Sequence, residues 1–136
     1  SDVYKRQVYA PCAVGATLNS GTIPHLRCRI VAGSANNQLE GPGDADALHA
    51  RGILHAPDYV VNGGGALALG LMHAGASDEE EIRRRVEGIG TTLAGIFREA
   101  ADRDESPVVA ARRRVERVLA RGRAARRTSQ ADAPPA

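Results

Sequence analysis

Neutral amide side chains stand where two short apolar segments of this sequence end. Asn36 and Asn37 lie in the small-residue loop "AGSANNQ", and Asn62 comes directly before the glycines Gly63–Gly65. An asparagine amide offers two donors and an acceptor without net charge, which suits a carboxamide, a ribose hydroxyl or an amino acid carboxylate. Glycine allows a flat ligand to approach the backbone closely. This pattern favours a binding site for a polar, largely neutral ligand.

Each of these features also has a purely structural interpretation. Asparagine satisfies backbone groups in turns, and a glycine run forms a tight turn into a helix. Asp58 is either a polar anchor or the cap of its own turn. The pairing of Asn36 with Asn37, repeated by Asn62 at the next segment end, favours a ligand site over turn formation alone.

Other reactive side chains lack partners for catalysis. Cys12 is a possible nucleophile, but the four histidines are scattered and form no recognisable motif with it, so a buried or loop thiol is favoured. The sequence contains no GxGxxG loop, no Walker loop and no metal-ligand cluster, so no metal is expected. Lys5 is the only lysine.

The overall composition excludes several classes of protein. The net charge is only +2, and the arginines between residues 112 and 127 are interpreted as a solvated helix face, so no nucleic acid partner is expected. No apolar run approaches the roughly 18–20 residues that cross a bilayer, and no signal peptide is visible. Two cysteines without metal or disulfide spacing favour a reducing cytoplasm.

Alternating strand and helix patterns must position these residues. We predict strands at residues 8–9, 28–32 and 59–61, with a helical turn before the second and a helix over "GDADALHARG" that ends at Gly52. Strands that alternate with helices indicate a parallel sheet covered by helices. Such sheets bind ligands beyond the carboxyl ends of their strands. Three loops would meet there: residues 11–13, 36–37 and 62–65.

The second half of the sequence is helical. Residues 65–74 are apolar on nearly all sides and are predicted to form a buried helix. Ser77 is predicted to cap an amphipathic helix of about seven turns, since apolar residues recur every three or four positions from Ile82 to Ala100. Pro107 starts a further helix, and from Gly122 onward the loss of periodicity predicts a disordered tail.

Four blocks of the sequence resemble the Glu/Leu/Phe/Val amino acid dehydrogenase family, and its leucine, valine and phenylalanine dehydrogenase branch in particular. They are "VYAPCAVGATLN", "IVAGSANNQL", "GILHAPDYVVNGGG" and "VEGI…LAGIF". The resemblance covers roughly residues 8–120. It implies the C-terminal half of a Rossmann-type parallel-sheet NAD-binding domain followed by C-terminal α-helices.

The resemblance also implies an activity. Enzymes of this family use NAD to deaminate an L-amino acid oxidatively and reversibly to a 2-oxo acid and ammonia. The substrate here would be a branched-chain or aromatic amino acid. The alternatives are a glutamate-specific member, which a basic pocket residue would support, and a non-catalytic NAD-binding or interaction module.

Site residues follow from the matched blocks. Cys12, Ala13, Asn36 and Asn37 match positions beside the nicotinamide half of the cofactor, and Asn37 is also assigned to the substrate carboxylate, although the resemblance does not divide the roles of the two asparagines. Ala66 and Leu69 match positions that shape the substrate side-chain pocket. They are three apart and share one helix face. Ala66 is small, which leaves room for a larger substrate side chain.

The sequence pattern and the resemblance together divide the chain into four segments. Residues 1–7, "SDVYKRQ", are interpreted as non-native and adapter-derived, residues 8–75 as a partial NAD-binding domain, 76–121 as C-terminal helices and 122–136 as the tail. The family's catalytic lysine and aspartate belong to an N-terminal catalytic domain, so this chain is expected to be a C-terminal fragment that is inactive alone. The complete protein is expected to form a homo-oligomer.

Overall fold

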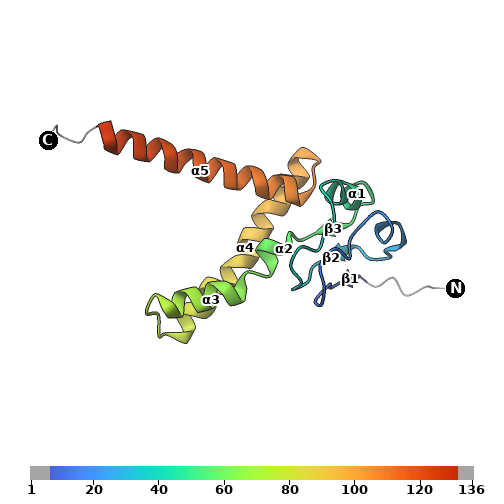
Figure 1. Ribbon diagram of the computed structural model, residues 1–136, viewed down its shortest axis with the longest axis horizontal. Helices are drawn as coiled ribbons and strands as arrows, with labels where there is room; N and C mark the ends of the chain where they lie inside the picture. Colours follow the sequence, from blue (N-terminus) through green and yellow to red (C-terminus); the bar gives the residue numbers. More distant parts are fainter. Residues whose placement is uncertain (1–6, 132–136) are drawn as a thin grey trace.

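The computed structural model describes residues 7–131. A small α/β part lies at the N-terminal end, and long helices extend away from it (Figure 1). The α/β part holds a parallel sheet in the order β1 (Val8–Tyr9), β2 (Ile30–Val31) and β3 (Leu54–His55). The carbonyl oxygen of Gln7 accepts hydrogen bonds from the amides of Arg29 and Ile30, which extends the pairing of β1 with β2. The predicted parallel α/β architecture is confirmed.

The strand register places side chains in two rows across the sheet. The rows are Val8, Ile30, Leu54 and Tyr9, Val31, His55. Because consecutive side chains of a strand point to opposite faces, the two rows lie on opposite faces of the sheet. Val31 and His55 are buried, whereas Val8 is half exposed. The described helices and loops of the α/β part therefore cover mainly the Val31 face.

The core of the α/β part lies on that covered face. It consists of Leu18, Ile23, Val31, Leu48 and Ile53. Ile23 comes from the 3-10 helix η1 (Ile23–His25), and Leu48 comes from α1 (Asp44–Ala50). At the start of α1, Oδ2 of Asp44 accepts from the Gly41 amide at 2.7 Å, and after its end Gly52 has a φ of +66°. The predicted helix and its glycine terminus are confirmed.

The predicted strand at residues 59–61 is wrong. The third strand lies earlier, at Leu54–His55, and the segment from Asp58 forms the short helix α2 (Asp58–Val61). β-branched and aromatic residues favour strands only weakly, because their preference depends on what the strand packs against. Here Pro57 stands at the N-cap and Asp58 in the first turn, which are features of a helix start.

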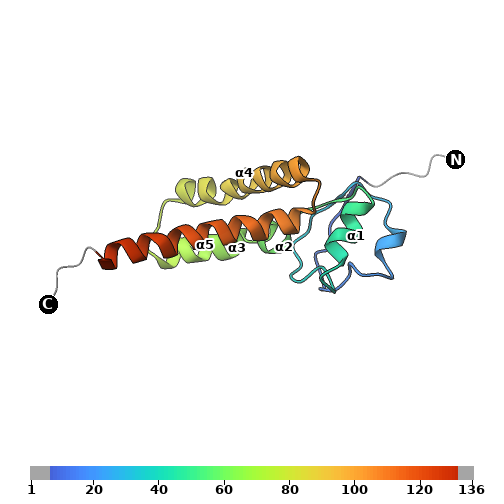
Figure 2. The same ribbon diagram turned by 90° about the horizontal axis from the view of Figure 1, so that it is seen from above.

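Three long helices follow α2. α3 (Gly64–His73) and α4 (Glu79–Arg103) form a hairpin, and α5 (Pro107–Ala131) starts beside the end of α4 and then diverges from it (Figures 1 and 2). The predicted seven-turn helix is confirmed. Its N-cap is Asp78, whose Oδ1 accepts from the Glu80 amide at 3.0 Å, and not Ser77 as predicted. A carboxylate in that position also interacts favourably with the positive end of the helix dipole.

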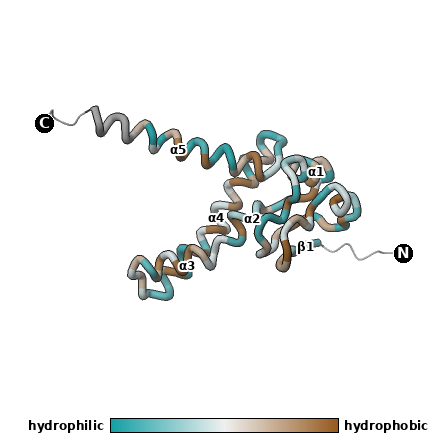
Figure 3. The backbone as a smooth tube through the Cα atoms, in the orientation of Figure 1, coloured by the Kyte–Doolittle hydropathy of each residue, from teal (hydrophilic) through white to brown (hydrophobic). Residues whose placement is uncertain are grey.

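Two further predictions about the helices are wrong. α3 consists mainly of apolar residues and ends at His73 (Figure 3), but none of its residues is buried, and Leu69 is 68% exposed. Among the described residues α3 packs mainly on α4, which covers one of its sides. α5 continues past Gly122 to Ala131, because alanine and arginine are strong helix formers. The remainder of the predicted tail, residues 132–136, lies outside the described residues.

The helices are tied to the α/β part at the bend between α4 and α5. Ser106 is buried there, and its hydroxyl donates to Oδ1 of Asp46 on α1 at 3.0 Å. Arg113 forms a two-pronged ion pair with Glu105 within this bend. Across residues 7–131, no helix is both long and apolar enough to span a membrane.

Candidate functional site

The loops that follow β1 and β2 pack directly against each other. The amide of Ala35 donates to the carbonyl oxygen of Pro11 at 2.9 Å. Gly33 lies against the Pro11 backbone with no space for a side chain between them. Because both loops leave the carboxyl ends of neighbouring parallel strands, they bring their exposed residues to one edge of the sheet.

Gly15 and the asparagine pair form the second contact between these loops. A Cβ on Gly15 would lie 2.7 Å from the carbonyl oxygen of Asn36 and 2.8 Å from that of Asn37. The amide of Ala16 donates to the Asn37 carbonyl oxygen at 2.7 Å. Asn37 adopts a left-handed conformation with a φ of +52°, which asparagine tolerates better than most residues. The backbone of the asparagine pair is therefore held in place while both side chains stay exposed.

The loop that follows α2 joins the same edge through its asparagine. Nδ2 of Asn62 donates to Oδ1 of Asn36 at 2.6 Å, although the two residues are 26 positions apart. Asn62 is the C-cap of α2, and its own amide donates to the Asp58 carbonyl oxygen at 2.9 Å. The predicted meeting of the segments that contain Asn36 and Asn62 is therefore observed.

Asp58 and Gln38 support this arrangement from inside. Oδ2 of Asp58 accepts from the backbone amide of Gln38 at 3.0 Å, and its Oδ1 accepts from the Tyr59 amide at 2.8 Å. Asp58 is therefore both a polar anchor between two segments and a cap of its own turn. The Gln38 side chain is fully buried and donates to the carbonyl oxygens of Gly33 and Ala35 at 2.8 and 2.9 Å. Gln38 was not predicted as a site residue, because nothing in its spacing or charge distinguishes it from a loop glutamine.

Cys12 and Ala13 lie on the exposed part of the loop after β1. Hydrogen bonding by Ser34, which belongs to the loop after β2, lowers the pKa of the Cys12 thiol. Burial instead raises the pKa of Cys28, which lies away from this edge of the sheet, just before β2. The structure therefore brings Cys12 into the same cluster as Ser34 and Asn36.

Ala66 and Leu69 lie on α3, one to two turns beyond Asn62. Both are exposed. Their spacing of three places them on one side of α3, as expected. The loops that contain Asn36 and Asn62 are therefore followed by an exposed, apolar side of α3.

His55 is a buried titratable residue next to this cluster. It ends β3, and neither ring nitrogen has a hydrogen-bond partner among the described residues. Burial lowers the pKa of His55, and the carboxylate of Asp58 opposes this effect. The sequence contained no sign of this burial, because the histidine stands in a short segment that a loop or an exposed strand would equally accommodate.

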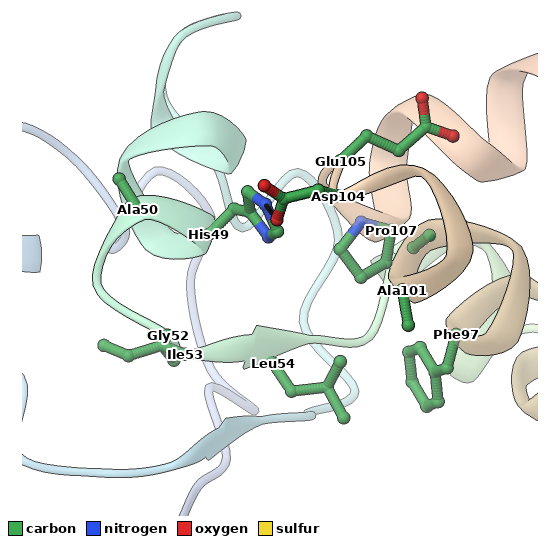
Figure 4. Close-up of a pocket in the computed structure, with 11 residues that line it drawn as sticks. His49, Ala50, Gly52, Ile53, Leu54, Phe97, Ala101, Asp104, Glu105 and Pro107 are labelled. Atoms are coloured by element: carbon green, nitrogen blue, oxygen red, sulfur yellow. Dashed lines mark hydrogen bonds and ion pairs between the residues drawn. The ribbon is translucent and has the colours of Figure 1, made fainter.

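A separate pocket lies at the opposite, amino end of β3, with a volume of about 600 Å³. Figure 4 shows His49 and Asp104 facing each other at its rim, with Leu54 and Phe97 below. Nε2 of His49 and Oδ1 of Asp104 are 3.2 Å apart. None of the predicted site residues lines this pocket.

The amide cluster provides neutral groups that can recognise a ligand. Asn36, Asn37 and Asn62 offer neutral donors and acceptors, and Ala13 beside them leaves room for a ligand. Residues 7–131 contain no lysine. The arrangement can hold and orient a ligand at the sheet edge.

Comparison with known proteins identifies the family of this chain. Residues 3–125 match the family model described as Glutamate/Leucine/Phenylalanine/Valine dehydrogenase. Leucine dehydrogenase of Bacillus cereus is 45% identical over 97 residues, which make up 71% of this chain and 26% of that protein. Valine dehydrogenase of Streptomyces albus is 42% identical over 119 residues, or 88% of this chain and 32% of that protein.

A solved structure shares both the fold and much of the sequence. The crystal structure of L-tryptophan dehydrogenase from Nostoc punctiforme superimposes with a TM-score of 0.76 at 43% identity, over 80% of this chain and 33% of that one. The chain thus spans about a third or less of the length of these relatives.

Proposed function

Because the chain belongs to the Glutamate/Leucine/Phenylalanine/Valine dehydrogenase family, we propose that it is the cofactor-binding portion of an NAD-dependent amino acid dehydrogenase. The proposed reaction is the reversible oxidative deamination of a branched-chain or aromatic L-amino acid to a 2-oxo acid and ammonia. Similarity to leucine, valine and L-tryptophan dehydrogenases supports this range of substrates.

The residues at the sheet edge fit the nicotinamide half of the cofactor. Bound NAD supplies the hydride acceptor, which takes the hydrogen and electron pair from the substrate Cα. Cys12 and Ala13 would flank the nicotinamide ribose, and Asn36 and Asn37 would hold the carboxamide or the substrate carboxylate. The support is chemical: the exposed side chains are small or neutral amides, and they converge from the loops after neighbouring strands.

The start of α3 supports an apolar substrate side chain. Ala66 and Leu69 would form one wall of the pocket, and both are apolar and exposed on one side of the helix. Recognition of a glutamate side chain would require a cationic partner, which neither position provides. The small Ala66 favours a large, aromatic substrate side chain over a small one.

The chain supplies recognition and leaves acid–base chemistry to another domain. We propose that the catalytic lysine and aspartate come from an N-terminal catalytic domain of a longer protein, and that the pyrophosphate-binding loop precedes Val8 in the same NAD-binding domain. In that protein, residues 8–75 belong to a Rossmann-type NAD-binding domain and residues 76–121 to helices that pack back on the catalytic domain. We further propose a cytoplasmic homo-oligomer.

The hydrogen bond between Asn36 and Asn62 is the observation that supports this proposal most directly, because it joins two separate loops at the edge where a cofactor would enter. The test is an assay of the complete protein for NADH formation with L-leucine, L-valine, L-phenylalanine, L-tryptophan and L-glutamate. We expect turnover with one or more apolar amino acids and none with the isolated chain. Activity on glutamate alone, or turnover by the isolated chain, would contradict the proposal.

A further inference from the structure

We propose that Asn62 is a positioning residue: its hydrogen bond to Asn36 turns the Asn36 amide so that its NH2 group, and not its carbonyl oxygen, faces a bound ligand. This inference rests on the proposed function, because it assigns Asn36 the task of binding an oxygen acceptor of the cofactor or substrate. The acceptor is either the carboxamide oxygen of nicotinamide or the carboxylate of the amino acid.

In the hydrogen bond between the two side chains, Asn62 is the donor and Asn36 is the acceptor. Oδ1 of Asn36 accepts from Nδ2 of Asn62 at 2.6 Å. An asparagine side chain has its oxygen and nitrogen on opposite sides of one planar group. With the oxygen turned toward Asn62, the two N–H donors of Asn36 point away from it. The Asn36 side chain is exposed, so these donors are accessible to a ligand.

Contacts with neighbouring segments hold the backbones of both Asn62 and Asn36 in place. The Asn62 backbone is fixed at the end of α2 by its hydrogen bond to the Asp58 carbonyl oxygen. Asp58 stands four residues earlier, on the same side of the helix, and its carboxylate accepts from the Gln38 amide at 3.0 Å. α2 therefore holds the loop that follows β2 at two points, Asn36 and Gln38. On its other side the Asn36 backbone lies against Gly15.

The pair can be examined first in the intact 136-residue chain by nuclear magnetic resonance of the side-chain amides. We expect the Asn62 amide protons to be shifted by the hydrogen bond and to return to the position of a free amide in Asn36→Ala. Asn36→Asp still offers an acceptor, so it should keep the shifted signals. Asn62 signals that do not respond to Asn36→Ala would overturn the inference.

Kinetic measurements on the complete enzyme then test whether the orientation of the Asn36 amide affects ligand binding. Asn62→Asp presents only acceptors to Asn36, so the Asn36 amide must turn and expose its carbonyl oxygen to the ligand. We expect KM for NAD or for the amino acid to rise about tenfold or more, with a smaller change in kcat, since hydrogen bonds to charged groups are the strong ones. An unchanged KM in Asn62→Asp would overturn the inference.

A double substitution separates positioning from direct contact. If Asn62 acts through Asn36, Asn36→Ala and Asn36→Ala/Asn62→Ala should have the same KM within about twofold. A clearly larger loss in the double variant would show that Asn62 binds the ligand itself, and would overturn the inference. The control is Thr92→Ala on α4, which removes a hydroxyl that donates to the Gly88 carbonyl oxygen of the same helix and should leave KM unchanged.

The two proposals fail in different ways. Absence of turnover in the unsubstituted complete enzyme would refute the proposed function, and the assigned role of Asn36 with it. Normal turnover combined with a clearly higher KM in Asn36→Ala/Asn62→Ala than in Asn36→Ala would refute only the positioning role.

Discussion

Gly33 and Pro11 approach each other so closely that a Cβ on Gly33 would lie 2.1 Å from the Pro11 carbonyl oxygen. The Pro11 oxygen belongs to the backbone, and the position of a Cβ is fixed by the backbone, so neither atom can rotate away as the end of a flexible side chain would. This contact joins the loops after β1 and β2, and through them it positions Cys12 and Asn36. The arrangement of the two loops at this edge of the sheet therefore requires a residue without a side chain at position 33.

Gly33→Ala is expected to destabilise the chain by about 2 kcal/mol or more, because overpacking against a fixed backbone forces the loops apart. Urea denaturation followed by circular dichroism measures the change in the free energy of unfolding. The matched control is Gly88→Ala, since a Cβ at Gly88 on α4 meets no atom within 4 Å. That control should be neutral or stabilising by up to about 1 kcal/mol. Equal effects of the two substitutions would contradict the close contact.

The two cysteines are expected to react at different rates. Cys12 is exposed and its pKa is lowered by hydrogen bonding from Ser34, whereas burial raises the pKa of Cys28. Because the thiolate is the nucleophile, iodoacetamide near neutral pH should modify Cys12 first. Mass spectrometry of peptides at successive times measures both rates. Ser34→Ala should slow the reaction of Cys12 and leave that of Cys28 unchanged. A faster reaction at Cys28 would show that the Ser34 interaction is absent.

Local patterns in the sequence were enough to predict the elements that carry their own signals. α1 ends where Gly52 takes a positive φ, and α4 follows the three-to-four spacing of its apolar residues from Ile82. Both signals act within a few residues of the chain. The segment from Asp58 to Val61 is a helix and not the predicted strand, because Pro57 at the N-cap and Asp58 in the first turn outweigh the weak strand preference of its β-branched and aromatic residues.

The candidate site was predictable only in part, for a similar reason. The position of Asn36 and Asn62 after successive apolar segments indicated that they would meet, and they do. The buried states of Gln38 and His55 depend on how separate segments pack, which no short pattern encodes. The exposure of α3 was not predictable either. An apolar helix sequence indicates that the helix packs against other parts of a protein, but it does not indicate whether residues 7–131 contain the packing surface.

Asp58→Ala is expected to destabilise the chain by about 1–3 kcal/mol, because it leaves the backbone amide of Gln38 without its acceptor. Asp58→Asn retains an oxygen at the same position and should cost less. Chemical denaturation measures both. Asp102→Ala provides a control, since Asp102 is exposed on α4. Equal losses in Asp58→Ala and Asp102→Ala would mean that Asp58 does not anchor Gln38.

His55 is expected to make the stability of the chain depend on pH. Burial lowers the pKa of His55 in the folded state, while in the unfolded chain it returns to about 6.5. The unfolded state therefore binds more protons as the pH falls through about 6.5, so the free energy of unfolding decreases there and is unaffected above it. The difference between wild type and His55→Leu isolates this contribution, because all other groups are common to both.

His55→Leu should therefore be at least as stable as wild type at about pH 8, because it removes two buried ring nitrogens that lack partners among the described residues. Its advantage should grow as the pH is lowered to about 5. Urea denaturation at several pH values measures the two curves, with His73→Gln as a control at an exposed histidine on α3. A constant difference between wild type and His55→Leu over this range would mean that His55 titrates equally in the folded and unfolded states, and hence that its ring reaches water.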